Sequence, residues 1–135
     1  LGSQYLEIAT KRQQAGDAAG AKAAYKKADD TYAKIGEKYP DQANYINYVR
    51  GSINSAIDPD SKLGLAKPFY EALVASLEQK ADRTDNQTAM LKTALQYMIV
   101  YEFNVKKNKV AAKEWAGKML GVDPTNEIAK QVQAM

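Results

Sequence analysis

The chain has 135 residues, of which 45% are hydrophobic and 26% are charged, a length and composition typical of one globular domain rather than a disordered polymer. It contains no cysteine and no histidine, so disulfides and thiolate metal sites are excluded and the commonest general base is missing. The formal net charge of +3 is too small to indicate nucleic-acid binding.

The first helix pair is predicted over residues 2–39. Its first helix ends at Ala15-Gly16-Asp17, where Gly16 favours a stop and Asp17 favours the N-cap of the next helix. Apolar residues then recur at helical intervals from Ala21 to Tyr39, which predicts one amphipathic helix. Tyr39-Pro40-Asp41 ends that helix.

The second pair is predicted over residues 42–81. Its first helix ends at Asp58-Pro59-Asp60, because the residue before a proline is pushed out of helical geometry. Pro68 falls in the first turn of its second helix, where a missing N–H costs little. The apolar stripe of the first helix consists of Ile46, Val49, Ile53 and Ile57, with Ala56 as the alternative to Ile57.

The third pair is predicted over residues 86–121, followed by a capping helix over residues 125–134. The segment from Leu95 to Phe103 is apolar on nearly every side, which is typical of a helix between two neighbours. The run Lys106–Lys109 forms the turn, and a sharp stop at Gly121-Val122-Asp123-Pro124 precedes the last helix. No strand-like alternation is present, so the sequence predicts an all-α fold of seven helices.

A spacing repeats along the chain. Ala21-x-x-x-Tyr25, Ala66-x-x-x-Tyr70 and Ala112-x-x-x-Ala116 are 45 and then 46 residues apart. A fixed period of helix pairs indicates an α-solenoid, in which neither helix of a pair buries its apolar stripe alone.

These residues resemble the tetratricopeptide repeat (TPR) family. The segment from Ala112 to Asn126 is similar to the family's repeat ending, Gly16-Asp17 with Ala21 and Tyr25 matches its mid-repeat turn, and Arg50-Gly51 resembles its first-helix signature. The segment DPDSKLGLAKPFYE also resembles one found in uncharacterised bacterial TPR proteins. The resemblance implies a right-handed α-solenoid of three antiparallel helix pairs and a capping helix, in a single domain over residues 1–135.

Three features depart from the family. The period exceeds the family's 34 residues, the second helix of the first pair is about two turns too long, and Val100 replaces the usual small residue. A period near 45 also suits HEAT or armadillo repeats, and an ordinary helical bundle is the third alternative.

The resemblance further implies a concave groove, lined by the first helices of the pairs, that holds a peptide or extended protein segment. Spacing independently supports the set from the second pair. Tyr45, Tyr48, Ser52 and Ser55 fall at i, i+3, i+7 and i+10 and therefore share one helix face. The alternative is that the tyrosines fill space between helices. The implied groove residues are Leu6, Thr10, Gln13 and Gln14 from the first pair, Tyr45, Tyr48, Ser52 and Ser55 from the second, and Tyr97, Tyr101 and Asn104 from the third.

Other motifs in the sequence do not indicate a functional site. Gly16 to Lys22 lacks the spacing of a phosphate loop, and Asp58 to Phe69 lacks the third and the bidentate ligands of a calcium loop. Asp29 and Asp30 diverge on a helix by about 100°, so they form no acid/base pair. We predict no catalytic, metal or cofactor site, no nucleic-acid partner and no membrane span. The basic run at Lys106, Lys107, Lys109, Lys113 and Lys118 is interpreted as a solvated turn, with an anionic contact as the alternative.

The sequence therefore predicts a non-enzymatic module that binds a protein or peptide, and a self-associating segment of a larger solenoid scaffold is the alternative. Because the sequence begins at Leu1, a removed leader or further preceding repeats are both expected possibilities. The family resemblance favours the bacterial cell envelope or periplasm, with the cytoplasm as the alternative.

Overall fold

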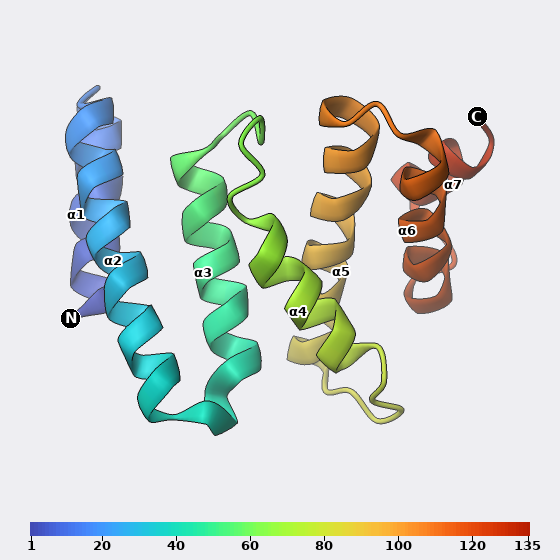
Figure 1. Cartoon of the computed structure of the whole chain (residues 1–135), viewed down its shortest axis with the longest axis horizontal. Coiled ribbons are helices and arrows are strands. Elements are labelled where there is room, and N and C mark those ends of the chain that lie inside the picture. The colour runs from blue at the N-terminus through green and yellow to red at the C-terminus, as the bar shows by residue number, and fades with distance from the viewer. The chain divides into compact units, whose positions relative to one another are not determined.

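The computed structural model describes residues 1–135, and its regular secondary structure is entirely helical, as predicted (Figure 1). None of its helices combines the length and the apolar character needed to cross a bilayer. A 3-10 turn, Pro40–Gln42, precedes α3, and a π-helical segment, Tyr101–Val105, follows α5. The seven α-helices are α1 (Gly2–Gln14), α2 (Ala18–Lys38), α3 (Ala43–Ile57), α4 (Lys67–Leu77), α5 (Asp85–Val100), α6 (Lys109–Val122) and α7 (Glu127–Gln133).

The chain divides into two compact units, Leu1–Ala66 with α1 to α3 and Lys67–Met135 with α4 to α7. Within each unit, every helix packs against the next one along the chain. Helices α1, α2 and α3 alternate in direction, as Figure 1 shows. The boundary between the units falls inside the segment predicted as the second helix pair, so α3 and α4 belong to different units.

The turn between α1 and α2 follows from its sequence. Gly16 has φ +81°, a left-handed conformation that glycine adopts without the Cβ clash of other residues. Asp17 then caps α2, and its carboxylate accepts a hydrogen bond of 2.9 Å from the Gly20 N–H. The predicted helix stop and the predicted N-cap are both confirmed.

Small residues bring the helices of the first unit together. Ala9 on α1 and Ala21, Ala24 and Ala28 on α2 are all buried, so the backbones of these two helices approach closely. The stripe predicted for α3 is also found, with Ile46, Ile53 and Ile57 buried and Val49 partly buried. Ala28, Ile53 and Ile57 form the core cluster of this unit, against which Tyr5, Leu6, Tyr25, Tyr32, Val49 and Leu65 pack.

A polar clamp holds α3 to α2. The Arg50 guanidinium donates from Nε to Asp29 Oδ1 at 2.8 Å and from Nη2 to Asp29 Oδ2 at 3.1 Å. Asn54, which is buried, donates from Nδ2 to the same Asp29 Oδ1 at 3.1 Å and to the Arg50 carbonyl at 2.8 Å. A bidentate, charge-assisted pair that is mostly shielded from water is stronger than an exposed ion pair. These polar contacts, together with apolar packing, therefore fix the register between α2 and α3.

The loop after α3 is organised by a buried carboxylate. Asp58 is 5% exposed, and its Oδ2 accepts hydrogen bonds from the N–H groups of Leu63 at 3.1 Å and Leu65 at 3.5 Å. Leu65 packs on the core cluster, so these bonds fold residues 59–66 back against the first unit. Pro59 is held at the end of α3 as a result.

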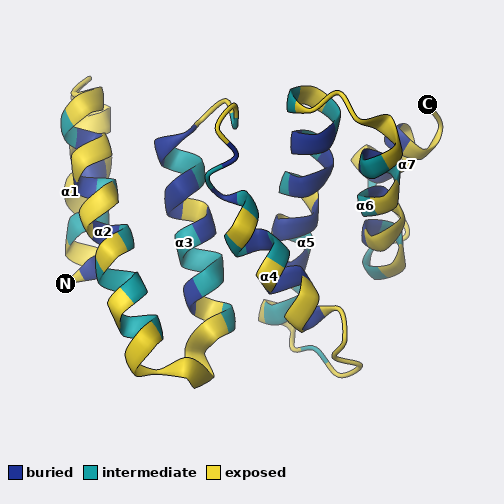
Figure 2. Ribbon diagram, in the orientation of Figure 1, coloured by how far each residue is buried: buried dark blue, intermediate teal, exposed yellow.

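In the second unit, α5 lies between α4 and α6, and both of them pack against it. Five of its residues, Leu91, Ala94, Leu95, Met98 and Ile99, are buried. Figure 2 shows the contrast, with exposed positions more frequent on α1 and α2 and buried positions more frequent on α5. The prediction of a helix between two neighbours is confirmed.

One detail of the third predicted pair differs from expectation. The first helix does not run regularly to its turn, because Tyr101–Val105 adopts π-helical geometry that the apolar pattern does not reveal. The second helix ends within the predicted stop. Val122 is its last residue and Asp123 is its C-cap, with the Asp123 N–H bonded to the Met119 carbonyl at 2.7 Å. The last helix spans Glu127–Gln133 and begins after an Asn126 cap.

Breaking the polar clamp should destabilise the fold. In Asp29→Asn the bidentate pair with Arg50 is lost, and we expect the free energy of unfolding to fall by about 1–2 kcal/mol. Asp30→Asn is the matched control, because Asp30 is exposed and forms no ion pair, and we expect a change within about 0.5 kcal/mol. Urea denaturation followed by circular dichroism measures both. Equal effects would show that the clamp is not a stabilising contact.

The ion pair between Asp123 and Lys92 should make stability depend on pH. The Lys92 Nζ lies 3.1 Å from Asp123 Oδ2, and the bond from Lys92 is the main cause that lowers the pKa of Asp123 below its ordinary value of 3.8. Desolvation acts in the opposite direction, and hydrogen bonds from Thr125 and Asn126 add to the lowering. A lowered folded-state pKa means that the ionised carboxylate stabilises the fold above pH 3.8 and that this stabilisation is lost as the pH falls through the lowered pKa.

We therefore expect Asp123→Asn to reduce the urea midpoint at pH 7 and to converge on the wild-type midpoint as the pH falls through the lowered pKa of Asp123. Asp82→Asn, which removes an exposed carboxylate without an ion pair, should track the wild type throughout. A difference for Asp123→Asn that stays constant over this range would contradict the assignment.

Candidate functional site

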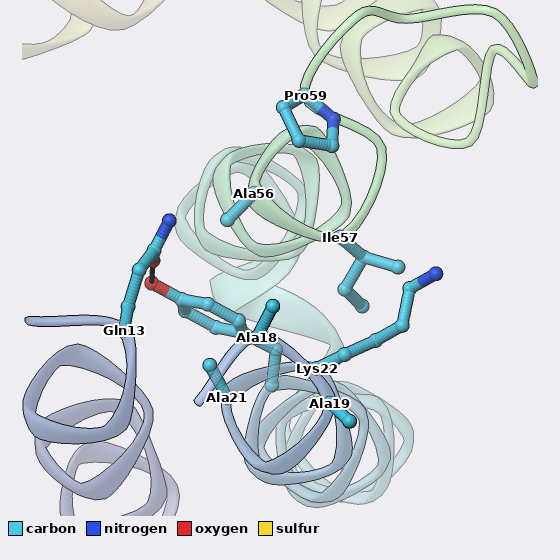
Figure 3. Close-up of a pocket in the computed structure, with 9 residues that line it drawn as sticks. Gln13, Ala18, Ala19, Ala21, Lys22, Ala56, Ile57 and Pro59 are labelled. Carbon is cyan, nitrogen blue, oxygen red and sulfur yellow. Dashed lines mark hydrogen bonds between the residues drawn. The ribbon is translucent and has the colours of Figure 1, made fainter. Parts of the chain in front are cut away.

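A groove lies in the first unit between α1 and α3. Both helices pack against α2 rather than against each other, so a space remains along α2. Two pockets share Tyr25 and Ala56 and together form what we term the unit 1 groove. The apolar pocket, of about 360 Å³, is lined by Leu6, Thr10, Tyr25, Tyr48, Val49, Ser52, Ile53 and Ala56. The lysine pocket, of about 400 Å³ (Figure 3), is lined by Gln13, Ala18, Ala19, Ala21, Lys22, Tyr25, Ala56, Ile57 and Pro59.

The groove exists because its walls carry small side chains. Ala18, Ala19 and Ala21 lie in the first turn and a half of α2, and Ala56 lies near the end of α3. A methyl group cannot span the distance between packed helices, so the space between them stays open. The Asp58 loop places Pro59 at one end of the lysine pocket.

Tyr25 separates the two pockets. It comes from the middle of α2, is half-buried, and donates from its hydroxyl to Gln13 Oε1 at 3.1 Å (Figure 3). This bond uses the acceptor of the Gln13 amide and leaves its Nε2 as a donor at the rim. A tyrosine in this position offers an apolar body to a ligand while its polar tip is already satisfied.

Two hydroxyls of the apolar pocket, those of Thr10 and Ser52, are engaged with their own helices. Thr10 Oγ1 donates to the Leu6 carbonyl at 3.0 Å, and Ser52 Oγ donates to the Tyr48 carbonyl at 3.1 Å. Because each of these hydroxyls has only one hydrogen, neither offers a donor to a ligand. The lining of the apolar pocket therefore favours contact with an apolar side chain.

Lys22 is the one charged side chain that lines either pocket, and it is exposed. No carboxylate lies within ion-pair distance of its Nζ, whereas Lys11 and Lys62 of the same unit are paired with Glu7 and Asp60. No carboxylate lines the groove at all. Lys22 is therefore the one charge on the groove walls, and the carboxylates of Asp17, Asp58 and Asp60 belong to residues that flank the lining residues along the chain.

The structure brings together part of the residue set implied by the family resemblance. Leu6, Thr10, Tyr48 and Ser52 line the apolar pocket, and Gln13 lines the lysine pocket. The other three from this unit line neither pocket: Gln14 is exposed, Tyr45 is 51% exposed, and Ser55 is half-buried.

The three implied residues of the second unit lie in a different setting. Tyr97 packs between Tyr70, at 5.1 Å between ring centroids, and Tyr101, at 6.0 Å and nearly parallel. Tyr101 is only 5% exposed, and Lys67 and Lys106 lie over its ring at 5.4 and 5.9 Å. Tyr101 therefore packs inside this unit, with little of its ring exposed. Asn104 is exposed.

Sequence reasoning missed the residues at the centre of the groove. Tyr25 and Ala56 were interpreted as members of apolar stripes, and Lys22 was considered only within a rejected phosphate loop. One signal was present in the sequence, since Tyr25 is a large residue on a helix whose other core positions are alanines, Ala21, Ala24 and Ala28. A large side chain flanked by small ones leaves open space beside it.

The site contains no arrangement for metal binding, because no group of three or more acidic, histidine or cysteine side chains is placed to hold an ion. No protein-family model, curated protein or solved structure matches the chain. The functional assignment therefore depends on the groove and its chemistry.

The open space of the groove can be tested by filling it. In Ala56→Leu the larger side chain enters the wall shared by the two pockets, and we expect a change in the free energy of unfolding of less than about 1 kcal/mol. Ala28→Leu is the matched control, because Ala28 is fully buried in the core cluster, and we expect a loss of about 1–3 kcal/mol from overpacking. Urea denaturation measures both variants, and an equally large loss in Ala56→Leu would show that this space is not available.

Proposed function

We propose that the chain is a non-enzymatic protein–protein interaction module that holds an extended segment of a partner protein in the unit 1 groove. The observation that carries this proposal is the groove itself, which is open, lined by two helices that both pack on a third, and rich in tyrosine and small residues. Tyrosine provides contact area at low entropic cost, which suits recognition surfaces. Neither pocket contains a pair of ionisable groups suited to acid/base chemistry.

The helical-repeat interpretation supports the same function. We propose that the chain is a solenoid of the TPR type, and sequential packing within each unit is the pattern expected of such repeats. The small residues at the repeating positions, Ala21, Ala66 and Ala112, are all buried, as are Ala9 and Gly51 in the middle of α1 and α3. Solenoids of this kind present extended grooves as binding surfaces.

The groove is held in place before any partner arrives. The Asp29–Arg50 clamp fixes α3 on α2, the Gly16 turn and the Asp17 cap fix α1 beside α2, and the Asp58 carboxylate fixes Pro59. A partner that enters a preformed site does not have to order these elements, so more of the contact energy appears as affinity. A pocket of about 360 Å³ is large enough for a bulky side chain of a bound segment.

Peptide selection tests the proposal. We expect a displayed random-peptide library to yield binders to the wild-type chain, and we expect Ala56→Leu to weaken the selected peptides by about tenfold or more, since its side chain occupies the groove. Fluorescence polarisation of labelled peptides measures this effect. Tyr39→Ala is the control, because Tyr39 is an exposed tyrosine that lines neither pocket and should leave affinity unchanged.

The two variants must first be shown to be folded by circular dichroism. Selected peptides that bind wild type and Ala56→Leu equally would place binding outside the groove. A library that yields no binder would remove the peptide-binding proposal and favour a scaffold role, which light scattering at rising protein concentration would then reveal as self-association.

A further inference from the structure

We infer that the unit 1 groove selects an extended segment in which a bulky apolar side chain is followed within a few residues by an acidic side chain. This inference rests on the proposed peptide-binding function and specifies the partner's chemistry. It is argued from the different character of the two pockets and from the lining residues that they share.

The apolar pocket sets the first requirement. Leu6, Val49 and Ile53 supply aliphatic surface, and Tyr25 and Tyr48 supply aromatic surface. The hydroxyl hydrogens of Thr10 and Ser52 are directed to the carbonyls of their own helices. A polar side chain placed here would lose hydrogen bonds to water and meet a mostly apolar lining, whereas an apolar side chain of leucine size or larger would gain contact.

The lysine pocket sets the second requirement. Lys22 borders it without an internal carboxylate partner, and no acidic side chain lines either pocket to repel an incoming anion. Gln13 and Lys22 extend along opposite sides of this pocket (Figure 3). The free Nε2 of Gln13 suits a backbone carbonyl of the bound segment, and the Lys22 ammonium suits a carboxylate. Charge complementarity at this end therefore favours an acidic residue over a basic one.

The two pockets adjoin, because Tyr25 and Ala56 line both of them. A bound segment that places one side chain in each pocket therefore needs only a short stretch of chain between the two side chains. The acidic residue is expected within a few residues of the apolar one.

The test uses three synthetic peptides on one glycine–serine scaffold, with the central sequences Leu-Ala-Glu-Glu, Leu-Ala-Lys-Lys and Ala-Ala-Glu-Glu. Each is titrated into the full ¹⁵N-labelled chain, and the amide shifts of Ala18, Ala21, Tyr25 and Ser52 are followed by NMR. We expect the first peptide to bind about fivefold more tightly than the second, with a preference that shrinks as salt rises. The third should bind more weakly than the first because it leaves the apolar pocket empty.

Two charge-reversal variants provide the decisive comparison. Lys22→Glu should reverse the preference, so that the Lys-Lys peptide binds more tightly than the Glu-Glu peptide. Lys26→Glu is the matched control, since Lys26 is an exposed lysine of the same helix that lines neither pocket, and it should preserve the wild-type order. A reversal by both variants would assign the preference to the overall charge of α2 and overturn the role of Lys22.

The remaining outcomes separate this inference from the proposed function. Equal binding of the acidic and basic peptides at the groove amides would overturn the inference and leave a peptide-binding groove. Absence of shifts at the groove amides with all three peptides would overturn the inference too, while the displayed library would decide the proposed function independently. Groove amides that shift with protein concentration alone would show that a second copy of the chain occupies the groove, which would also overturn it.

Discussion

The first unit depends on one constraint, the close packing of two helices on the narrow alanine stripe of α2. Ala21, Ala24 and Ala28 are almost completely buried, so α1 and α3 each approach the α2 backbone closely. Both helices pack against α2 and not against each other. The groove is thus a consequence of the same alanines that build the core. The polar clamp of Asp29, Arg50 and Asn54 fixes the register between α2 and α3. Apolar contacts alone would specify this register less sharply.

Much of this architecture was predictable, because it follows from local rules. Gly16 and Asp17 predict a stop and a cap, and a period of 3.6 residues identifies the buried face of α3 through Ile46, Ile53 and Ile57. The groove residues were predictable only in part. Periodicity tells which face of a helix is covered, but it does not tell whether neighbouring side chains fill the space, so Tyr25 and Ala56 were assigned to the core. Whether a tyrosine lines a groove or packs inside depends on partners far away in the sequence.

The third predicted pair shows the same limit, because the π-helical segment Tyr101–Val105 has no signature in the apolar pattern. Asp58 is a second case. The spacing around Asp58 superficially matched a calcium loop. Its carboxylate instead accepts hydrogen bonds from backbone N–H groups of its own loop and so has a structural role.

The two units use their aromatic residues in opposite ways, and side-chain size explains the difference. In the second unit, large residues such as Leu91, Leu95 and Met98 fill the space around α5, and Tyr101 is drawn into the interior. Its ring is covered by lysine side chains, so little of it remains for a partner. In the first unit, alanines border the unit 1 groove, and Tyr25 and Tyr48 keep part of their surface in its apolar pocket. The capacity for recognition is therefore concentrated where the chain places small residues next to tyrosines, and Lys22 gives that surface its single charge.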